Sequence, residues 1–151
     1  MPLSNLKHAP QVMLVMTPFP HSIGIDESVA AAYDMMERHA IRHLPVKDGG
    51  ALVGVISERD VALAMGKGVH LPSAQTLRVR EVYLPQAYVV NVHERLDSVL
   101  LHMAQQHIGS ALVVKDGRLA GIFTMADACR LLGGMLRDRF PVSPDDDPDA
   151  A

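Results

Sequence analysis

The stretch Gly54–Asp60 reads GVISERD, and it returns 67 positions later as Gly121–Asp127, which reads GIFTMAD. Both copies contain a glycine, two strand-forming residues, a hydroxyl residue and, three positions on, an aspartate that opens an apolar helical run. A hydroxyl and a carboxylate therefore share the first turn of a helix in each copy. The pattern predicts two related units, each ending in a strand followed by a helix.

Two compatible interpretations explain this shared helical turn. In the first, Ser57 or Thr124 is the N-cap and the aspartate completes a capping box, which contributes about 1 kcal/mol per helix. In the second, the N–H groups at the helix N-terminus face a phosphate, while the carboxylate accepts hydrogen bonds from a ribose diol. A carboxylate has several acceptor sites, so Asp60 and Asp127 can serve both purposes.

Composition excludes several classes of protein. The 151 residues, 48% of them hydrophobic, suffice for one compact domain or for two small lobes that share a core. No apolar run approaches the ~20 residues of a membrane span, and the N-terminus lacks the apolar core of a signal peptide, so we expect a cytoplasmic protein without a membrane partner. The net charge of −3 and the absence of Lys or Arg clusters argue against nucleic acid as a partner. The single cysteine, Cys129, is expected to be a small core residue.

The first unit begins after a polar N-terminal segment. Pro18 and Pro20 exclude a helix and lead into a short extended piece at 21–25. Asp26 is the expected N-cap of an amphipathic helix over 29–40. Two strands over 41–46 and 51–56 then flank a hairpin turn at 48–50, and the second hairpin is predicted to turn at 116–117.

The chain is an internal duplication. A gapless shift of 67 positions aligns residues 15–66 with 82–133 and gives 11 identities over 52 positions. The middle of this alignment has an alternative, because the Val-Lys-Asp at 46–48 also matches the Val-Lys-Asp at 114–116.

This duplication defines the expected domains and fold class. We divide the chain into a first repeat at 12–66, a linker at 67–78, a second repeat at 79–136 and a disordered acidic tail at 137–151. The fold class is α+β, with two strand–helix–strand–strand–helix repeats, each too small to bury enough apolar surface to be stable alone. We expect them to pack about a pseudo-two-fold axis and to leave a ligand cleft at each junction.

The order of these motifs resembles that of a tandem pair of CBS domains, the regulatory module named after cystathionine β-synthase. The similarity extends from Val12 to about Leu136 and rests on VMTP at 15–18, IRHLPV at 41–46 and the Gly-x-x-Ser/Thr-x-x-Asp ending of each half. The resemblance implies a module that binds an adenosine-containing ligand, such as AMP, ADP, ATP or S-adenosylmethionine, and regulates an effector protein. The alternative is a structural dimerisation or adaptor module with vestigial ligand sites.

The resemblance also implies two sites built across the halves, in which the Ser/Thr and Asp of one repeat hold the ribose and strands of the other enclose the base. One site would combine Thr124 and Asp127 with Thr17, Ser22, Ile23, Arg42, His43, Leu44 and Pro45. The other would combine Ser57, Arg59 and Asp60 with Val89, Val90, Ser110, Ala111 and Leu112. Arg59 could reach a phosphate, whereas its counterpart is Ala126.

No other sequence pattern indicates catalysis or metal binding. No Gly-x-Ser-x-Gly, Walker-type loop or pair of carboxylates for acid–base work occurs, so we do not expect an enzyme. His39 and His43 lack a third acidic ligand at matching spacing, so we expect no metal site. Met36 and Met103 occupy matching places and are expected to fill the core.

The amphipathic helices at 29–40 and 96–107 have more apolar surface than one thin lobe can cover, which predicts a homodimer.

Overall fold

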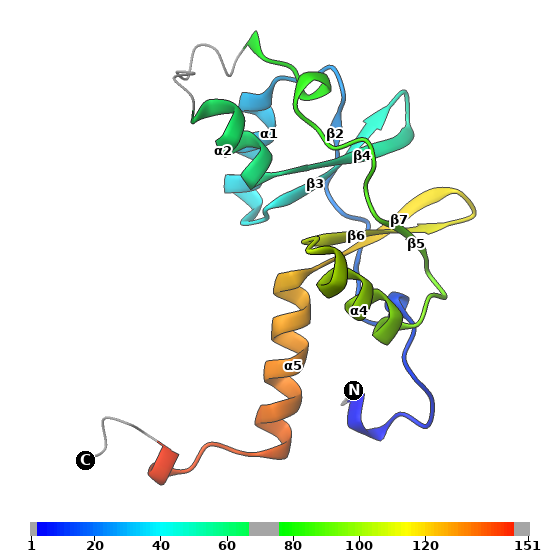
Figure 1. Cartoon of the computed structure of the whole chain (residues 1–151), viewed down its shortest axis with the longest axis vertical. Coiled ribbons are helices and arrows are strands. Elements are labelled where there is room, and N and C mark those ends of the chain that lie inside the picture. Colours follow the sequence, from blue (N-terminus) through cyan, green and yellow to red (C-terminus); the bar gives the residue numbers. More distant parts are fainter. Residues whose placement is uncertain (1–2, 67–75, 147–151) are drawn as a thin grey trace.

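The computed structural model describes residues 3–66 and 76–146, apart from the side chain of residue 4. These residues form two small lobes, each with a sheet and two helices (Figure 1). The predicted α+β class and the tandem strand–helix–strand–strand–helix repeats are confirmed.

The two repeats have the same order of elements. The first contains β2 (Ile23–Gly24), α1 (Val29–His39), β3 (His43–Asp48), β4 (Ala51–Ser57) and α2 (Glu58–Met65). The second contains β5 (Val89–Asn91), α4 (Leu96–Gln106), β6 (Ser110–Lys115), β7 (Arg118–Thr124) and α5 (Met125–Arg139). Their sheets have the orders β2-β3-β4 and β1-β7-β6-β5, where β1 is Thr17–Pro18. Short 3-10 helices cover Leu3–Asn5, Val12–Leu14, Val79–Glu81 and Pro144–Asp146.

Both hairpins turn over two residues in the left-handed region. The φ angles are 55° and 89° at Gly49 and Gly50, and 51° and 76° at Asp116 and Gly117. Positive φ at both positions is the requirement of a type I′ turn, whose twist matches that of the flanking strands. The ladders shift register between Val46 and Lys47 in the first hairpin and 67 positions later in the second, between residues 113 and 114. The gapless alignment is therefore correct, and the alternative based on Val-Lys-Asp is wrong.

The N-cap of α1 is Ser28, so the prediction of Asp26 was wrong. The Ser28 side chain accepts a hydrogen bond from the backbone N–H of Ala31 at 3.0 Å. An N-cap must directly precede the first helical residue, which is Val29. Asp26 instead accepts two hydrogen bonds from the guanidinium of Arg80, at 3.1 and 3.0 Å.

The leading segments of the two repeats, residues 12–18 and 79–84, are exchanged between the lobes. Val12 is fully buried in the core of the second lobe, and β1 pairs with β7. Reciprocally, Val79 is buried in the core of the first lobe, and Leu84 forms an antiparallel bridge with Val55. Each spatial lobe therefore takes its leading segment from the other sequence repeat, which ties the two repeats together.

This exchange explains the glycine that opens each motif. A Cβ at Gly54 would overlap the backbone carbonyl of Leu84, and one at Gly121 would meet the Met16 side chain and lie 3.0 Å from the carbonyl oxygen of Thr17. Only a residue without a side chain lets the crossing segment pair so closely with β4 or β7.

The core has two clusters and a junction. Met36 lies in the core of the first lobe and Met103 in that of the second, so their predicted role as core residues is confirmed. A third cluster of Val55, Leu112 and Ile122 joins the two sheets. Val55 and Ile122 are equivalent under the shift of 67, so the junction uses matching residues of both repeats, as a pseudo-two-fold arrangement requires.

Helix α5 differs from the prediction in two respects. It continues to Arg139, so residues 137–139 are helical and not part of a disordered tail. None of its residues is buried, and Cys129 is exposed, so the assignment of Cys129 to the core was wrong. Figure 1 shows the reason, because α5 runs away from both sheets. Residues 67–75 of the predicted linker at 67–78 and residues 147–151 of the predicted tail at 137–151 lie outside the described residues, whereas Arg78 of the linker forms an antiparallel bridge with Ser28. Among the described helices, none is long and apolar enough to cross a membrane.

Candidate functional site

The first motif forms a capping box at the start of α2. The backbone N–H and the hydroxyl of Ser57 both donate to Asp60 Oδ2 at 2.8 Å, and the backbone N–H of Asp60 donates to Ser57 Oγ at 3.1 Å. The capping interpretation is therefore confirmed here. Among the described residues, no hydrogen bond reaches the second oxygen, Asp60 Oδ1, which remains an available acceptor.

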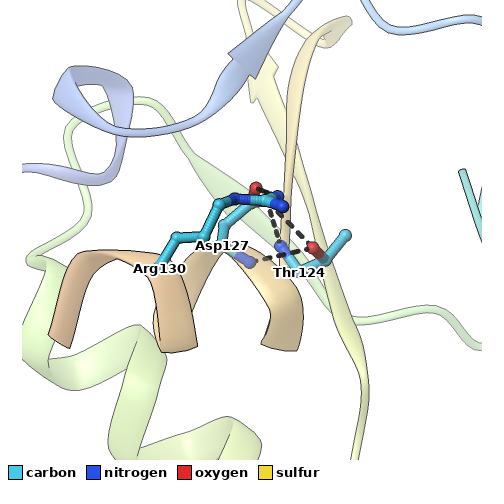
Figure 2. Close-up of polar contacts among 3 residues, drawn as sticks. All are labelled: Thr124, Asp127 and Arg130. Carbon is cyan, nitrogen blue, oxygen red and sulfur yellow. Dashed lines mark hydrogen bonds and ion pairs between the residues drawn. The ribbon is translucent and has the colours of Figure 1, made fainter. Parts of the chain in front are cut away.

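The second motif forms the same box at the start of α5 and adds an arginine. The backbone N–H and hydroxyl of Thr124 donate to Asp127 Oδ2 at 2.8 and 3.0 Å, and the N–H of Asp127 lies 3.4 Å from Thr124 Oγ1. Arg130 Nη2 donates to the other carboxylate oxygen, Asp127 Oδ1, at 2.8 Å. Figure 2 shows the Arg130 side chain folded back over Asp127. Both oxygens of Asp127 thus accept hydrogen bonds, whereas among the described residues only Oδ2 of Asp60 does.

A cavity of about 760 Å³ opens at the start of α5, and we call it the α5 cavity. Five of the nine residues predicted for this site line it: Thr17, Arg42, His43, Thr124 and Asp127. The N-terminus of α5, from the second repeat, here faces Arg42 and His43 at the start of β3 in the first. The structure therefore brings together the two residues predicted to hold a ribose, Thr124 and Asp127, and residues of the other repeat.

The other four predicted residues do not line the α5 cavity: Ser22, Ile23, Leu44 and Pro45. Ile23 and Leu44 are buried in the core of the first lobe, with exposed fractions of 3% and 0%. Leu44 follows His43 in β3, and successive side chains of a strand point to opposite faces, so only one of the two can face the cavity.

Several lining residues escaped the sequence reasoning, among them Phe19, His21, Ile41, Gly109, Met125 and Arg130. Phe19 has a φ of 47° and a side chain that is 92% exposed at the cavity. His21 stacks on His39 with ring centroids 3.7 Å apart. Arg130 had a readable signal, because it lies three positions after Asp127 on a helix and thus on the same face.

A second cavity of about 630 Å³, the α2 cavity, lies between the start of α2 and the end of α4. Of the residues predicted for the second site, only Ser57 and Arg59 line it. The remaining six do not: Asp60, Val89, Val90, Ser110, Ala111 and Leu112. Ala111 and Leu112 are buried in the core and at the sheet junction, because β6 is covered on both of its faces.

His43 lies where the two cavities meet. The cavities share Arg42, His43, Gly109 and Met125, and a Cβ at position 109 would lie only 3.1 Å from His43 Nε2, so a glycine there leaves room for the ring. Burial lowers the pKa of His43, although both motif aspartates, Asp60 and Asp127, act in the opposite direction. The ring is therefore uncharged near neutral pH, and an anion beside it would favour protonation.

Arg42 is available to a ligand in either cavity. Its Nε lies 3.4 Å from Glu58 Oε2, and its side chain is largely exposed. Exposed ion pairs of this kind contribute little, at most about 1 kcal/mol. An anionic ligand can therefore draw Arg42 away from Glu58 at small cost.

The family model of the CBS domain matches residues 12–67 and 79–134. The chain belongs to the CBS domain family, with two copies of the domain. It is 27% identical over 115 residues to the CBS domain-containing protein YhcV of Bacillus subtilis, a match that covers 74% of this chain and 78% of YhcV. It is 28% identical over 112 residues to hypoxic response protein 1 of Mycobacterium tuberculosis, and this match covers 73% of this chain and 76% of that protein.

Solved structures show the same fold with ligands. The crystal structure of the CBS domain pair of protein MJ0100, in complex with 5′-methylthioadenosine and S-adenosyl-L-methionine, is similar with a TM-score of 0.73 and 28% identity, over 84% of this chain and 98% of that one. A crystal structure of hypoxic response protein 1 has two coordinated zinc ions, at a TM-score of 0.68 and 25% identity, over 80% of this chain and 98% of that one. In residues 3–66 and 76–146 of this chain, no group of three or more His, Cys, Asp or Glu side chains is arranged to hold a metal.

Proposed function

We propose that this chain is a non-catalytic, cytoplasmic sensor that binds an adenosine-containing ligand between its two CBS repeats and regulates an effector protein. The observation that carries the proposal is the composite α5 cavity. Thr124 and Asp127 at the start of α5 belong to one repeat, and Arg42 and His43 belong to the other. A ligand that contacts both repeats would stabilise one relative placement of them, which is how occupancy can reach a partner.

The chemistry of the α5 cavity suits an adenosine ligand. Its volume of about 760 Å³ is in the range that small-molecule sites occupy. Asp127 Oδ1 can accept from a ribose diol once Arg130 moves aside, and the helix N-terminus together with Arg42 favours a phosphate. The adenosyl compounds bound by the CBS pair of MJ0100, which is 28% identical to this chain, support the same ligand class.

Isothermal titration calorimetry tests this proposal directly. The full chain is titrated with adenosine, AMP, ADP, ATP, 5′-methylthioadenosine and S-adenosylmethionine, and with GMP as a control for the base. We expect saturable binding of at least one adenosine compound and weaker binding of GMP. If none of the six compounds binds, the sensor proposal is wrong.

The second candidate is a structural dimerisation or adaptor module. Helix α5 favours it, because Leu132, Met135 and Leu136 are exposed and none of the 15 residues of α5 is buried. The helices first considered for dimer contacts, α1 and α4, bury much of their apolar surface but leave Tyr33 and Leu101 exposed. We propose a homodimer on these grounds, and light scattering at tens of micromolar tests it. A dimer without any adenosine ligand would favour the adaptor.

A further inference from the structure

We propose that Arg130 is a latch over Asp127 that makes the α5 cavity select a phosphorylated adenosine ligand over an unphosphorylated one. The inference rests on the proposed binding function and adds the ligand class. It arises from the one difference in polar contacts between the two capping boxes, which is the arginine drawn in Figure 2.

Arg130 occupies one of the two acceptor sites that a ribose diol would need. Asp127 Oδ2 already accepts from the backbone and hydroxyl of Thr124, so Oδ1 is the oxygen left for a ligand. Arg130 Nη2 holds that oxygen at 2.8 Å, and the Asp127 side chain is only 15% exposed. Oδ1 can accept two hydrogen bonds and Arg130 takes one of them, so a ribose diol that donates with both hydroxyls has to displace the guanidinium.

The displaced guanidinium needs a new hydrogen-bond acceptor, which only some ligands provide. The Arg130 side chain is 73% exposed, so its ion pair with Asp127 is weak, corresponding to at most about fivefold in an equilibrium constant. Arg130 lines the α5 cavity, where a phosphate can accept two hydrogen bonds from it. A nucleoside offers no such group, and the sulfonium of S-adenosylmethionine repels a cation.

The first motif lacks this device. Under the shift of 67 the residue that matches Arg130 is Leu63, and Asp60 Oδ1 accepts no hydrogen bond among the described residues. Arg59, the cation next to Asp60, instead lines the α2 cavity. The latch therefore belongs to the second motif alone, and the two repeats are not equivalent in their electrostatics.

Calorimetry with AMP and adenosine, which differ only in the phosphate, tests the latch. The full chain is compared with Arg130→Ala and Arg130→Gln, and with Arg137→Ala, which removes the same charge from the same helix at a residue outside both cavities. In the Arg130 variants we expect AMP affinity to fall on the order of tenfold and adenosine affinity to rise by up to about fivefold. The Arg137 variant should keep the ratio of the wild type.

The possible outcomes separate the latch from the function on which it rests. If the ratio of AMP to adenosine affinity is the same in the wild type and in both Arg130 variants, the latch is wrong while the binding function stands. A wild type that binds adenosine or S-adenosylmethionine more tightly than AMP also overturns the latch. A wild type that binds no adenosine compound overturns both. Melting temperatures identify a variant that fails to fold, and Arg130→Gln, which keeps a polar but shorter and uncharged side chain, then carries the comparison.

Discussion

The exchange of leading segments makes a strong prediction for Gly54→Ala. A methyl group at Gly54 would overlap the carbonyl of Leu84, which is backbone and cannot rotate away as the end of a side chain can. Relief requires the crossing segment to move, and this strains the two hydrogen bonds between Val55 and Leu84, of 3.1 and 2.8 Å. Overpacking costs about 1–3 kcal/mol, and each lost hydrogen bond about 1 kcal/mol, so we expect the free energy of unfolding to fall by about 2–5 kcal/mol.

Thermal and urea denaturation of the full chain measure this cost. For a chain of this size, 2–5 kcal/mol corresponds to a fall in melting temperature of about 5–15 °C. Gly133→Ala is the matched control, because it lies inside α5 with nothing within 4 Å of the added methyl group, and alanine favours a helix over glycine by about 1 kcal/mol. The control should therefore be as stable as the wild type or more so. A Gly54→Ala variant with the same melting temperature as the wild type would refute the close pairing of the segment 79–84 with β4.

Three further predictions concern stability. Ser28→Ala should lower the free energy of unfolding by about 1 kcal/mol because it removes the N-cap, and Asp26→Ala should lower it less. Thermal denaturation measures both, and the reverse order would contradict the cap assignment. Because burial lowers the pKa of His43, the unfolded chain binds a proton that the folded chain does not, so stability should fall as the pH drops below about 6.5. His43→Gln should flatten this dependence in urea denaturation at several pH values, and an unchanged slope would exclude His43 as its source. Truncation at Pro141 should change neither melting temperature nor ligand affinity, whereas a loss of several degrees would reveal that the tail docks.

Much of the fold could be predicted because its signals are local. The turns at Gly49-Gly50 and Asp116-Gly117 depend on residues that tolerate positive φ, and the capping boxes depend on a hydroxyl three positions before a carboxylate. The shift of 67 then related one half to the other. Each of these features is decided within a few residues, so a sequence pattern suffices.

The exchange of leading segments had no such signal. Val12 and Val79 are apolar and open their repeats, and nothing local indicates whether each packs on its own repeat or on the other. Gly54 and Gly121 were visible as a repeated pattern, but their reason, a chain crossing close to the strand, involves residues far apart in the sequence. The length of α5 was underestimated because its last turn does not pack on the lobes and so lacks a clear apolar face.

The candidate site was predicted only in part, because motif matching reaches only the residues inside the motifs. Motif matching identified Thr124 and Asp127 and the neighbouring strand of the other repeat, and the α5 cavity contains both. It also included Leu44, which alternation in β3 directs into the core. Arg130 and Phe19 were missed because they lie outside the quoted motifs, although they line the same cavity.

Asp127 is proposed to bind a ligand in addition to capping α5, and the affinity of Asp127→Asn for adenosine compounds tests this most directly. An amide keeps the shape of the carboxylate but removes its charge, so the cap should lose only part of its ~1 kcal/mol. If Asp127 holds a ribose, the loss of charge-assisted hydrogen bonds should weaken the tightest-binding adenosine compound ten- to a hundredfold in calorimetry. Asp138→Asn, on the same helix but outside both cavities, should bind as the wild type does. Equal affinities for wild type and Asp127→Asn would contradict the claim and leave Asp127 as a helix cap alone.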